Sequence, residues 1–374
     1  MSRISELWSG LTPNARRGVV GGAIGVCAIG LVAAIALGGG GSDDTAAKPK
    51  PTTTTAAPTT TAPVTTTTAV PHGPTAPLTG LPVPDPKILF RPALAVKVDN
   101  LDAPKESALP QTGLLRADVV FEEVVEGNIT RLVGIFHSQQ PGTVGPVRSA
   151  RGTDVELLAQ LRHPLLAWSG GNDFVVNAVH SSPYIIDVGY NAVPGMYHRD
   201  HSRRAPHNLY VNADEAWSHA PPRTPPPEHM FLYRKSGEKN PSLARKSQGV
   251  DLTWGGGGAS SPVSWRWDPK ARVYVRTQHG RVHKDSSGKP LTAKNVVVMV
   301  TKYSMSGISP VGHSVGTGEL FVFTNGRVIH GSWVRTRIDR VAALFDDKGK
   351  PVKLTPGNTF VELPKAGGTT AITK

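Results

Sequence analysis

Twenty consecutive residues without a charge, Gly18–Leu37, constrain this 374-residue chain more than any other feature. A helix rises about 1.5 Å per residue, so a run of this length matches the hydrocarbon core of a bilayer, roughly 30 Å thick. Basic residues precede the run and two aspartates follow it. This bias predicts a single transmembrane helix over residues 18–37, with residues 1–17 in the cytoplasm and the rest of the chain outside the cell membrane.

The alternative for this run is a cleaved signal peptide, for which Ala34-Ile35-Ala36 offers a cleavage site. We favour a retained signal anchor because the run is long for the apolar core of a signal peptide. Cys27, inside the run, is the one cysteine of the chain, so no intrachain disulfide can form. Val26 is larger than the small residue that precedes a lipid-modified cysteine, so Cys27 is not expected to carry lipid.

Residues 38–76 are predicted to form a disordered linker rich in Thr, Pro and Ala. Within it, Thr52–Val70 consists of threonine runs broken by alanine and proline, with no apolar periodicity that a core could bury. As polyproline II, at ~3.1 Å per residue, the linker reaches on the order of 120 Å. The sequence therefore predicts a tether between the membrane and a folded part.

Two folded domains are expected after the linker: an α+β domain over residues 77–222 and a mostly-β domain over residues 223–366, before a tail at 367–374. A proline cluster at Pro221–Pro227 marks the boundary between them. The second domain is basic, because residues 223–374 hold 24 Lys and Arg but only 10 Asp and Glu. Such a domain predicts contact with an anionic polymer of the cell wall or with lipid headgroups. Nucleic acid is not expected as a partner, because no recognisable motif for it is present.

Local patterns support this division. Val119–Val125 and Arg131–Phe136 are β-branched and apolar runs on either side of turn residues, which predicts a hairpin. Thr153–Leu161 carries apolar residues at helical spacing. In the second half the pattern is one of short strands, and Asn325-Gly326 is the strongest hairpin signal of the chain.

The segment Gly145–Arg151 (GPVRSAR) stands at the start of the predicted helix, with Ser149 at its N-cap. Arg148 and Arg151 lie three residues apart, beside backbone N–H groups that have no partner inside a helix. Guanidinium groups at such a position suit a carboxylate or a phosphate. We therefore predict an anion-binding site that contains Arg148, Ser149 and Arg151. The alternative is that both arginines pair with neighbouring glutamates.

The densest polar cluster of the chain, Tyr197–Asn208, is predicted to be a loop that lines part of the ligand site. Arg204, His207 and Asn208 are its candidates for the same cleft as Arg148 and Arg151. The spacing of its histidines fits no established zinc motif, and its arginines would repel a cation. The sequence therefore predicts no metal and no cofactor.

Three glutamates of the predicted hairpin, Glu122, Glu123 and Glu126, leave two alternatives open. Carboxylates can act as acid and base when their environments separate their pKa values, as a hydrolase of cell-wall glycan or peptide would require. They can equally form cross-strand ion pairs. In a strand, Glu122 and Glu126 share one face and Glu123 lies on the other. Since no nucleophile elbow surrounds Ser149 and no phosphate-binding glycine loop is present, the sequence specifies no reaction.

Several segments of the chain, in the same order, resemble the YerB-like family of bacterial envelope lipoproteins: Pro77–Val83 (PLTGLPV), Glu122–Phe136 (EEVVEGNITRLVGIF), Gly145–Arg151, Arg204–Val211 (RAPHNLYV), Gly316–Trp333 (GTGELFVFTNGRVIHGSW) and Leu354–Pro364 (LTPGNTFVELP). The resemblance implies a two-domain extracytoplasmic protein held at the membrane. It brings no established activity, because the family is itself a domain of unknown function. The chain departs from the lipoprotein members in having a membrane span where they carry a lipid-modified cysteine.

Together these features predict a membrane-anchored extracytoplasmic protein of the cell envelope. The leading hypothesis is a binding module for an anionic ligand. The alternative is an enzyme that acts on cell-wall glycan or peptide through the hairpin glutamates.

Overall fold

The computed structural model describes residues 73–83, 85–254, 262–366 and 370–373. The predicted transmembrane helix and the predicted linker up to residue 72 lie outside these ranges. Among the described residues, no helix is both long and apolar enough to cross a membrane. The described residues belong to a single folded unit that starts at Pro71.

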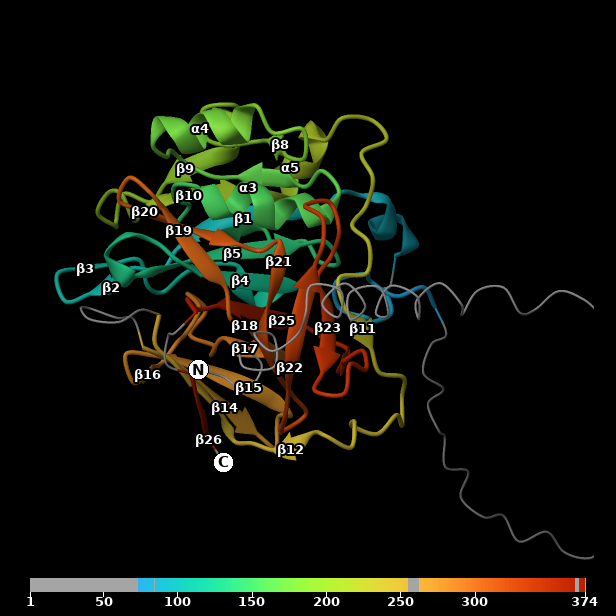
Figure 1. Ribbon diagram of the computed structural model, residues 1–374. Coiled ribbons are helices and arrows are strands. Elements are labelled where there is room, and N and C mark those ends of the chain that lie inside the picture. The colour runs from blue at the N-terminus through green and yellow to red at the C-terminus, as the bar shows by residue number, and fades with distance from the viewer. Residues whose placement is uncertain (1–72, 84, 255–261, 367–369, 374) are drawn as a thin grey trace, which may run out of the picture. The chain divides into compact units, whose positions relative to one another are not determined.

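A central sheet of 11 strands organises this unit. Ten of its strands run in the order β12 (Arg245–Lys246), β22 (Arg327–Arg335), β21 (Gly316–Thr324), β18 (Asn295–Met299), β25 (Thr359–Leu363), β4 (Val119–Val124), β5 (Thr130–Phe136), β1 (Leu94–Asp99), β7 (Leu165–Ala167) and β8 (Ile186–Asp187), and β23 (Ala343–Asp346) pairs with β22. Strand β25 comes from the end of the chain, yet it lies parallel to β4 on one side and to β18 on the other. Figure 1 shows these C-terminal strands beside β4 and β5. Both halves of the chain therefore share one sheet.

The other described elements form smaller layers. A six-stranded sheet contains β13 (Gly249–Leu252), β14 (Val263–Asp268), β15 (Val273–Gln278), β16 (Arg281–Val282), β17 (Thr292–Ala293) and β26 (Thr370–Thr373), and a three-stranded sheet contains β6 (Thr143–Val144), β9 (Tyr197–Arg199) and β10 (Leu209–Asn212). Three two-stranded ribbons pair β2 (Asp102–Ala103) with β3 (Glu106–Ser107), β11 (Leu232–Tyr233) with β24 (Lys353–Leu354), and β19 (Lys302–Ser306) with β20 (Ser309–His313). The α-helices are α3 (Gly152–Leu158), α4 (Asp173–His180) and α5 (Ala213–Ala216). The described fold is mostly β, with few helices.

Apolar residues cover both faces of the central sheet, which explains why β4 and β5 are buried along their whole length. On one face Val120 of β4 belongs to a cluster with Trp265 of β14. On the other face Phe121 belongs to a cluster with Leu157 of α3. Successive side chains of a strand point to opposite faces, so a strand between two such layers must be apolar or paired at every position.

Both predicted hairpins are confirmed. Strands β4 and β5 pair antiparallel, with Val119 opposite Ile135. Strands β21 and β22 pair around Asn325 and Gly326, whose φ angles of 51° and 69° are the left-handed values that a two-residue hairpin turn requires.

The predicted N-cap at Ser149 is wrong. Helix α3 begins at Gly152, and the carboxylate of Asp154 accepts the backbone N–H of Arg151 at 2.7 Å. Residues 148–150 are instead extended, since the Arg148 N–H donates to the carbonyl of Lys97 at 2.9 Å and the Ala150 N–H to that of Gly170 at 3.1 Å. Tertiary pairing with β1 and with the segment after β7 delays the helix by two residues.

Candidate functional site

Arg148 lies beside the end of β1 and keeps part of its guanidinium available. Its Nε forms an ion pair with Oδ2 of Asp99 at 2.8 Å. Its two terminal nitrogens donate to none of the residues that the structure describes, and 23% of the side chain is exposed. Arg148 therefore presents the two-pronged end of a guanidinium, the part that binds a carboxylate or phosphate in bidentate fashion.

His207 is held between two carboxylates. Its Nδ1 lies 2.6 Å from Oδ2 of Asp99, and its Nε2 lies 2.8 Å from Oε1 of Glu106. The hydrogen bond to Asp99, opposed by burial and assisted by Glu106, raises the pKa of His207. Although burial alone would raise the pKa of Asp99, the hydrogen bond from His207 and the charge of Arg148 lower it. Both ring nitrogens of His207 contact carboxylates, so neither is available to a ligand. His207 instead helps to hold Asp99, which in turn pairs with Arg148.

Arg151, by contrast, is fully engaged. Its Nε and Nη2 donate to Oε2 of Glu126 at 2.9 and 2.6 Å, and its Nη1 donates to the carbonyl of Ala150 at 2.8 Å. Ser309 of β20 donates to the other oxygen of Glu126. Burial opposes these hydrogen bonds, but they lower the pKa of Glu126 to about 2. For Arg151 the structure shows the alternative in which the arginine pairs with a glutamate of the hairpin.

A third arginine, Arg131 of β5, completes the cluster and was not among the predicted site residues. Its Nη1 donates to the carbonyl of Ser149 at 2.9 Å. Burial, together with the charges of Arg151 and Arg148, lowers the pKa of Arg131 to about 10. The predicted hairpin placed Arg131 opposite Glu123 of β4, but its position opposite Asp99 follows from the pairing of β5 with β1, which no local sequence signal showed. The Ser149 hydroxyl has no hydrogen bond to the described residues.

Glu122 and Glu123 are enclosed on opposite faces of β4, and both side chains are 0% exposed. Glu122 accepts from Nη2 of Arg276 at 2.8 and 2.6 Å. Glu123 contacts Lys97, which also donates to Asp154 at 2.8 Å. The structure therefore brings both glutamates into ion pairs in the interior.

The remaining predicted residues lie on the connection from β9 to β10. Asn208 accepts from Arg199 at 2.9 Å and donates to the carbonyls of Asp200 and Arg203, both at 3.3 Å. These bonds close the loop on itself. The side chain of Arg204 is exposed and forms no hydrogen bond or ion pair with another described residue, while its carbonyl accepts the backbone N–H of His207 at 3.0 Å. Asn208 is thus a structural residue of the loop, while Arg204 contacts the Arg148 cluster only through its backbone carbonyl and not through its guanidinium.

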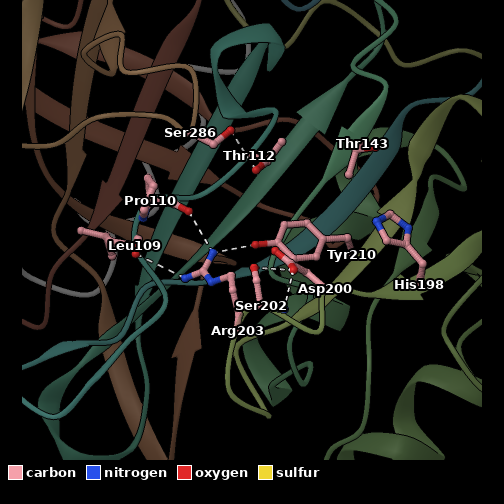
Figure 2. A pocket seen from close by; sticks show the side chains of 10 residues that line it. All are labelled: Leu109, Pro110, Thr112, Thr143, His198, Asp200, Ser202, Arg203, Tyr210 and Ser286. Carbon is pink, nitrogen blue, oxygen red and sulfur yellow. Dashed lines mark hydrogen bonds between the residues drawn. The ribbon is translucent and has the colours of Figure 1, made fainter.

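The same loop lines a pocket of about 550 Å³ that opens between it and residues of both halves of the chain (Figure 2). The lining residues are Leu109, Pro110, Thr112, Thr143, His198, Asp200, Ser202, Arg203, Tyr210 and Ser286. None of the predicted site residues lines this pocket. Four other residues of the Tyr197–Asn208 segment line it, namely His198, Asp200, Ser202 and Arg203.

Arg203 fixes one wall of the pocket (Figure 2). Its Nη1 donates to the hydroxyl of Tyr210 at 2.6 Å and to the carbonyl of Pro110 at 3.1 Å. Its Nη2 donates to the carbonyls of Ser107 and Leu109, both at 3.3 Å. No sequence signal separated Arg203 from the neighbouring Arg204, because the two differ only in what the tertiary fold places around them.

Comparison with known proteins places both halves of the chain in one family. Residues 78–225 match the model described as "Protein of unknown function (DUF3048) N-terminal domain", and residues 250–361 match the corresponding C-terminal domain. "Putative lipoprotein YerB" of Bacillus subtilis (strain 168) is 30% identical over 302 residues, which cover 77% of this chain and 85% of that protein. The crystal structure of the YerB protein from Bacillus subtilis superposes with a TM-score of 0.69 at 27% identity, covering 80% of this chain and 99% of that one.

Proposed function

Since the chain belongs to the DUF3048 family, with matches to both its N- and C-terminal domains, we propose that it is an envelope protein that binds an anionic group at Arg148. The observation that carries this proposal is the guanidinium of Arg148, whose terminal nitrogens have no partner among the described residues although the side chain is positioned by Asp99. A positioned cation that still has donors available is what an anion-binding site needs.

The charge around Arg148 supports the same conclusion. With His207 protonated, four cationic groups face three carboxylates, so the cluster keeps one positive charge that an anion can balance; the groups are Arg131, Arg148, Arg151 and His207 against Asp99, Glu106 and Glu126. The depressed pKa of Arg131 has burial as its largest cause, followed by repulsion from Arg151 and Arg148. Binding of an anion would relieve that repulsion.

The cellular location is part of this proposal. The YerB relative is named a lipoprotein, and this chain has an apolar run of membrane-spanning length at residues 18–37. We place the folded part outside the cytoplasm, anchored by that run, with the basic C-terminal half directed toward anionic wall polymer. If surface charge drives that contact, raising the salt from about 50 mM to about 500 mM will release the full-length protein from purified wall polymer. Retention unchanged by salt would contradict the electrostatic contact.

The geometry does not favour the hydrolase alternative. Glu122 and Glu123 are 0% exposed and lie in ion pairs, so neither can reach a glycan or peptide without opening the sheet layers. Glu126 is partly exposed, but its pKa of about 2 keeps it ionised and unsuited to donate a proton.

Titration of the full-length protein with inorganic phosphate and with succinate, followed by calorimetry, tests the anion site. Arg148→Ala removes charge-assisted hydrogen bonds and should weaken binding at least about tenfold. The matched control is Arg337→Ala, which removes the same charge from an exposed arginine paired with Asp339 at 2.7 Å and should leave binding unchanged. Absence of saturable binding of either anion, or an equal loss in both variants, would contradict the proposal.

A further inference from the structure

We infer that the pocket beside Arg203 is a second binding site and that it takes a neutral polyhydroxyl ligand, such as a sugar ring. This site is independent of the anion site at Arg148 and differs from it in chemistry. Its volume of about 550 Å³ lies in the range of small-molecule sites, roughly 300–1,000 Å³. Residues from both family domains line it, as the neighbouring positions of Thr112 and Ser286 in Figure 2 show.

The wall of the pocket is formed before any ligand arrives. Arg203 donates four hydrogen bonds, three of them to backbone carbonyls of the segment from Ser107 to Pro110. Because the donors of both terminal nitrogens are already engaged, Arg203 holds the wall in place and does not offer its two-pronged end to an anion. A preformed wall lowers the ordering cost of binding.

Asp200 gives the pocket its selectivity. Its Oδ1 accepts the backbone N–H of Ser202 at 2.9 Å and the hydroxyl of Ser202 at 2.6 Å. Its Oδ2 has no partner among the described residues. The hydrogen bonds from Ser202, side chain first and then backbone, lower the pKa of Asp200, so the group stays ionised at neutral pH. A carboxylate at the rim repels an anion and accepts hydrogen bonds from hydroxyl groups.

Hydroxyl groups also line the pocket. The oxygen of Tyr210 accepts from Arg203, which leaves the hydrogen of the Tyr210 hydroxyl available to a ligand. The hydroxyls of Thr112 and Ser286 lie 3.0 Å apart and hydrogen-bond each other across the two halves of the chain. Each serine or threonine hydroxyl both donates and accepts. A ligand whose hydroxyls also do both matches this lining, whereas a carboxylate can only accept.

The ring of His198 supplies a flat surface. It stacks on Tyr210 with the ring centroids 5.8 Å apart and an interplanar angle of 20°. A sugar ring has an apolar face as well as hydroxyl edges, and it can lie against such rings while its hydroxyls reach the polar groups.

Saturation-transfer NMR of the full-length protein with maltose and with N-acetylglucosamine tests the site. We expect saturable binding of at least one of these sugars, and a loss of at least about tenfold in affinity in Asp200→Asn. In that variant the side-chain oxygen still accepts from Ser202, so the loop is retained. Ser286→Ala, in the other half of the chain, should also weaken binding of the same sugar. Arg148→Ala should leave sugar binding unchanged, and phosphate should not compete.

Three outcomes would overturn the inference: neither sugar binds, Asp200→Asn and Ser286→Ala bind as the unmodified protein does, or phosphate displaces the sugar. Each variant is compared with the unmodified protein by thermal unfolding, and an unchanged midpoint assigns the loss to the site. The phosphate titration with Arg148→Ala is scored separately. A negative result for one site therefore does not contradict the proposal for the other site.

Discussion

Glu122 and Glu123 are neighbours in β4, yet the two faces of the central sheet give them different surroundings. Glu122 receives a guanidinium through both carboxylate oxygens, from Arg276 at 2.8 and 2.6 Å, and also the hydroxyl of Thr130 at 2.6 Å. Glu123 receives the single ammonium of Lys97, and its Oε2 has no hydrogen-bond partner in the described part of the chain. One terminal nitrogen of Arg276 therefore reaches both oxygens of Glu122, whereas the ammonium of Lys97, which is shared with Asp154, reaches one oxygen of Glu123.

The two faces also connect different parts of the molecule. Arg276 lies on β15, so its pair with Glu122 joins the two halves of the chain. Lys97 and Asp154 both come from the N-terminal half, so the pair on the other face holds that half together internally. Neighbouring residues of one type therefore take different roles, because the layer on each face supplies a different cation.

Each face holds a second carboxylate that competes for its cation. Burial and the charge of Asp154 raise the pKa of Glu123. Burial and the charge of Glu122 raise the pKa of Glu362, whose neighbour in the parallel register of β25 and β4 is Glu122 itself. Trp265 donates to Oε1 of Glu362 at 2.7 Å, but Oε2 of Glu362 lacks a partner among the described residues.

The largest effect is expected from Arg276→Met, which leaves Glu122 and Glu362 without their cation inside the protein. Breaking a buried ion pair in this way costs about 3–5 kcal/mol in the free energy of unfolding. Urea denaturation followed by tryptophan fluorescence measures it. Adding Glu122→Gln to the same chain should recover part of the loss, because it removes one stranded charge. A loss in the free energy of unfolding below about 1 kcal/mol would show that the ion pair between Arg276 and Glu122 contributes little to the stability of the protein.

A smaller loss, about 2–3 kcal/mol, is expected from Lys97→Met. Here Glu123 can take up a proton, because burial and Asp154 already raise its pKa. Glu123→Gln is the matched change on the carboxylate side and should cost less than about 1 kcal/mol, since one oxygen of Glu123 had no donor to lose. The same urea measurement applies. If Lys97→Met lowered the free energy of unfolding as much as Arg276→Met does, the ion pairs on the two faces of β4 would be equally important for stability.

The raised pKa of Glu362 makes the stability of the protein depend on pH. A carboxyl group whose pKa is raised on folding binds its proton more tightly in the folded state, so stability falls as pH rises from the unfolded pKa through the raised value. Glu362 should contribute such a fall, and Glu362→Gln should flatten it. Free energies of unfolding between about pH 4 and pH 8 check this. An identical slope in Glu362→Gln would show that its carboxyl does not titrate with folding.

The smallest effects concern the two half-buried arginines Arg148 and Arg151. Arg151→Ala removes two hydrogen bonds to Glu126 and should cost about 1 kcal/mol. Arg148→Ala removes one ion-pair contact of a partly exposed side chain and should cost less than about 0.5 kcal/mol. Thermal unfolding compares the two. The reverse order would mean that Arg148, not Arg151, has the structural role.

Much of the local structure could be predicted from sequence, because it follows from short-range chemistry. The turn at Asn325-Gly326 follows from the left-handed backbone that those residues tolerate. The hairpin of β4 and β5 follows from β-branched runs around a turn. Alternation also predicted that Glu122 and Glu123 point to opposite faces, since successive side chains of a strand do so. The apolar run at residues 18–37 lies outside the described residues, and its membrane-spanning role stays a prediction.

The contacts of those side chains could not be predicted from the sequence, because they depend on the tertiary structure. Whether a face of β4 is solvated or buried depends on layers formed by segments more than a hundred residues away, such as Arg276 for Glu122. Likewise, the sequence does not distinguish Arg148 from Arg151. Arg148 pairs with Asp99 through Nε and keeps its terminal nitrogens available, whereas Arg151 donates to Glu126 through Nε and Nη2. The local backbone and the family could be recognised from the amino-acid sequence alone, because both follow from short motifs in order. Charge pairing, burial and the pocket were set by long-range packing, because an ion pair depends on distance in space and not on spacing along the chain.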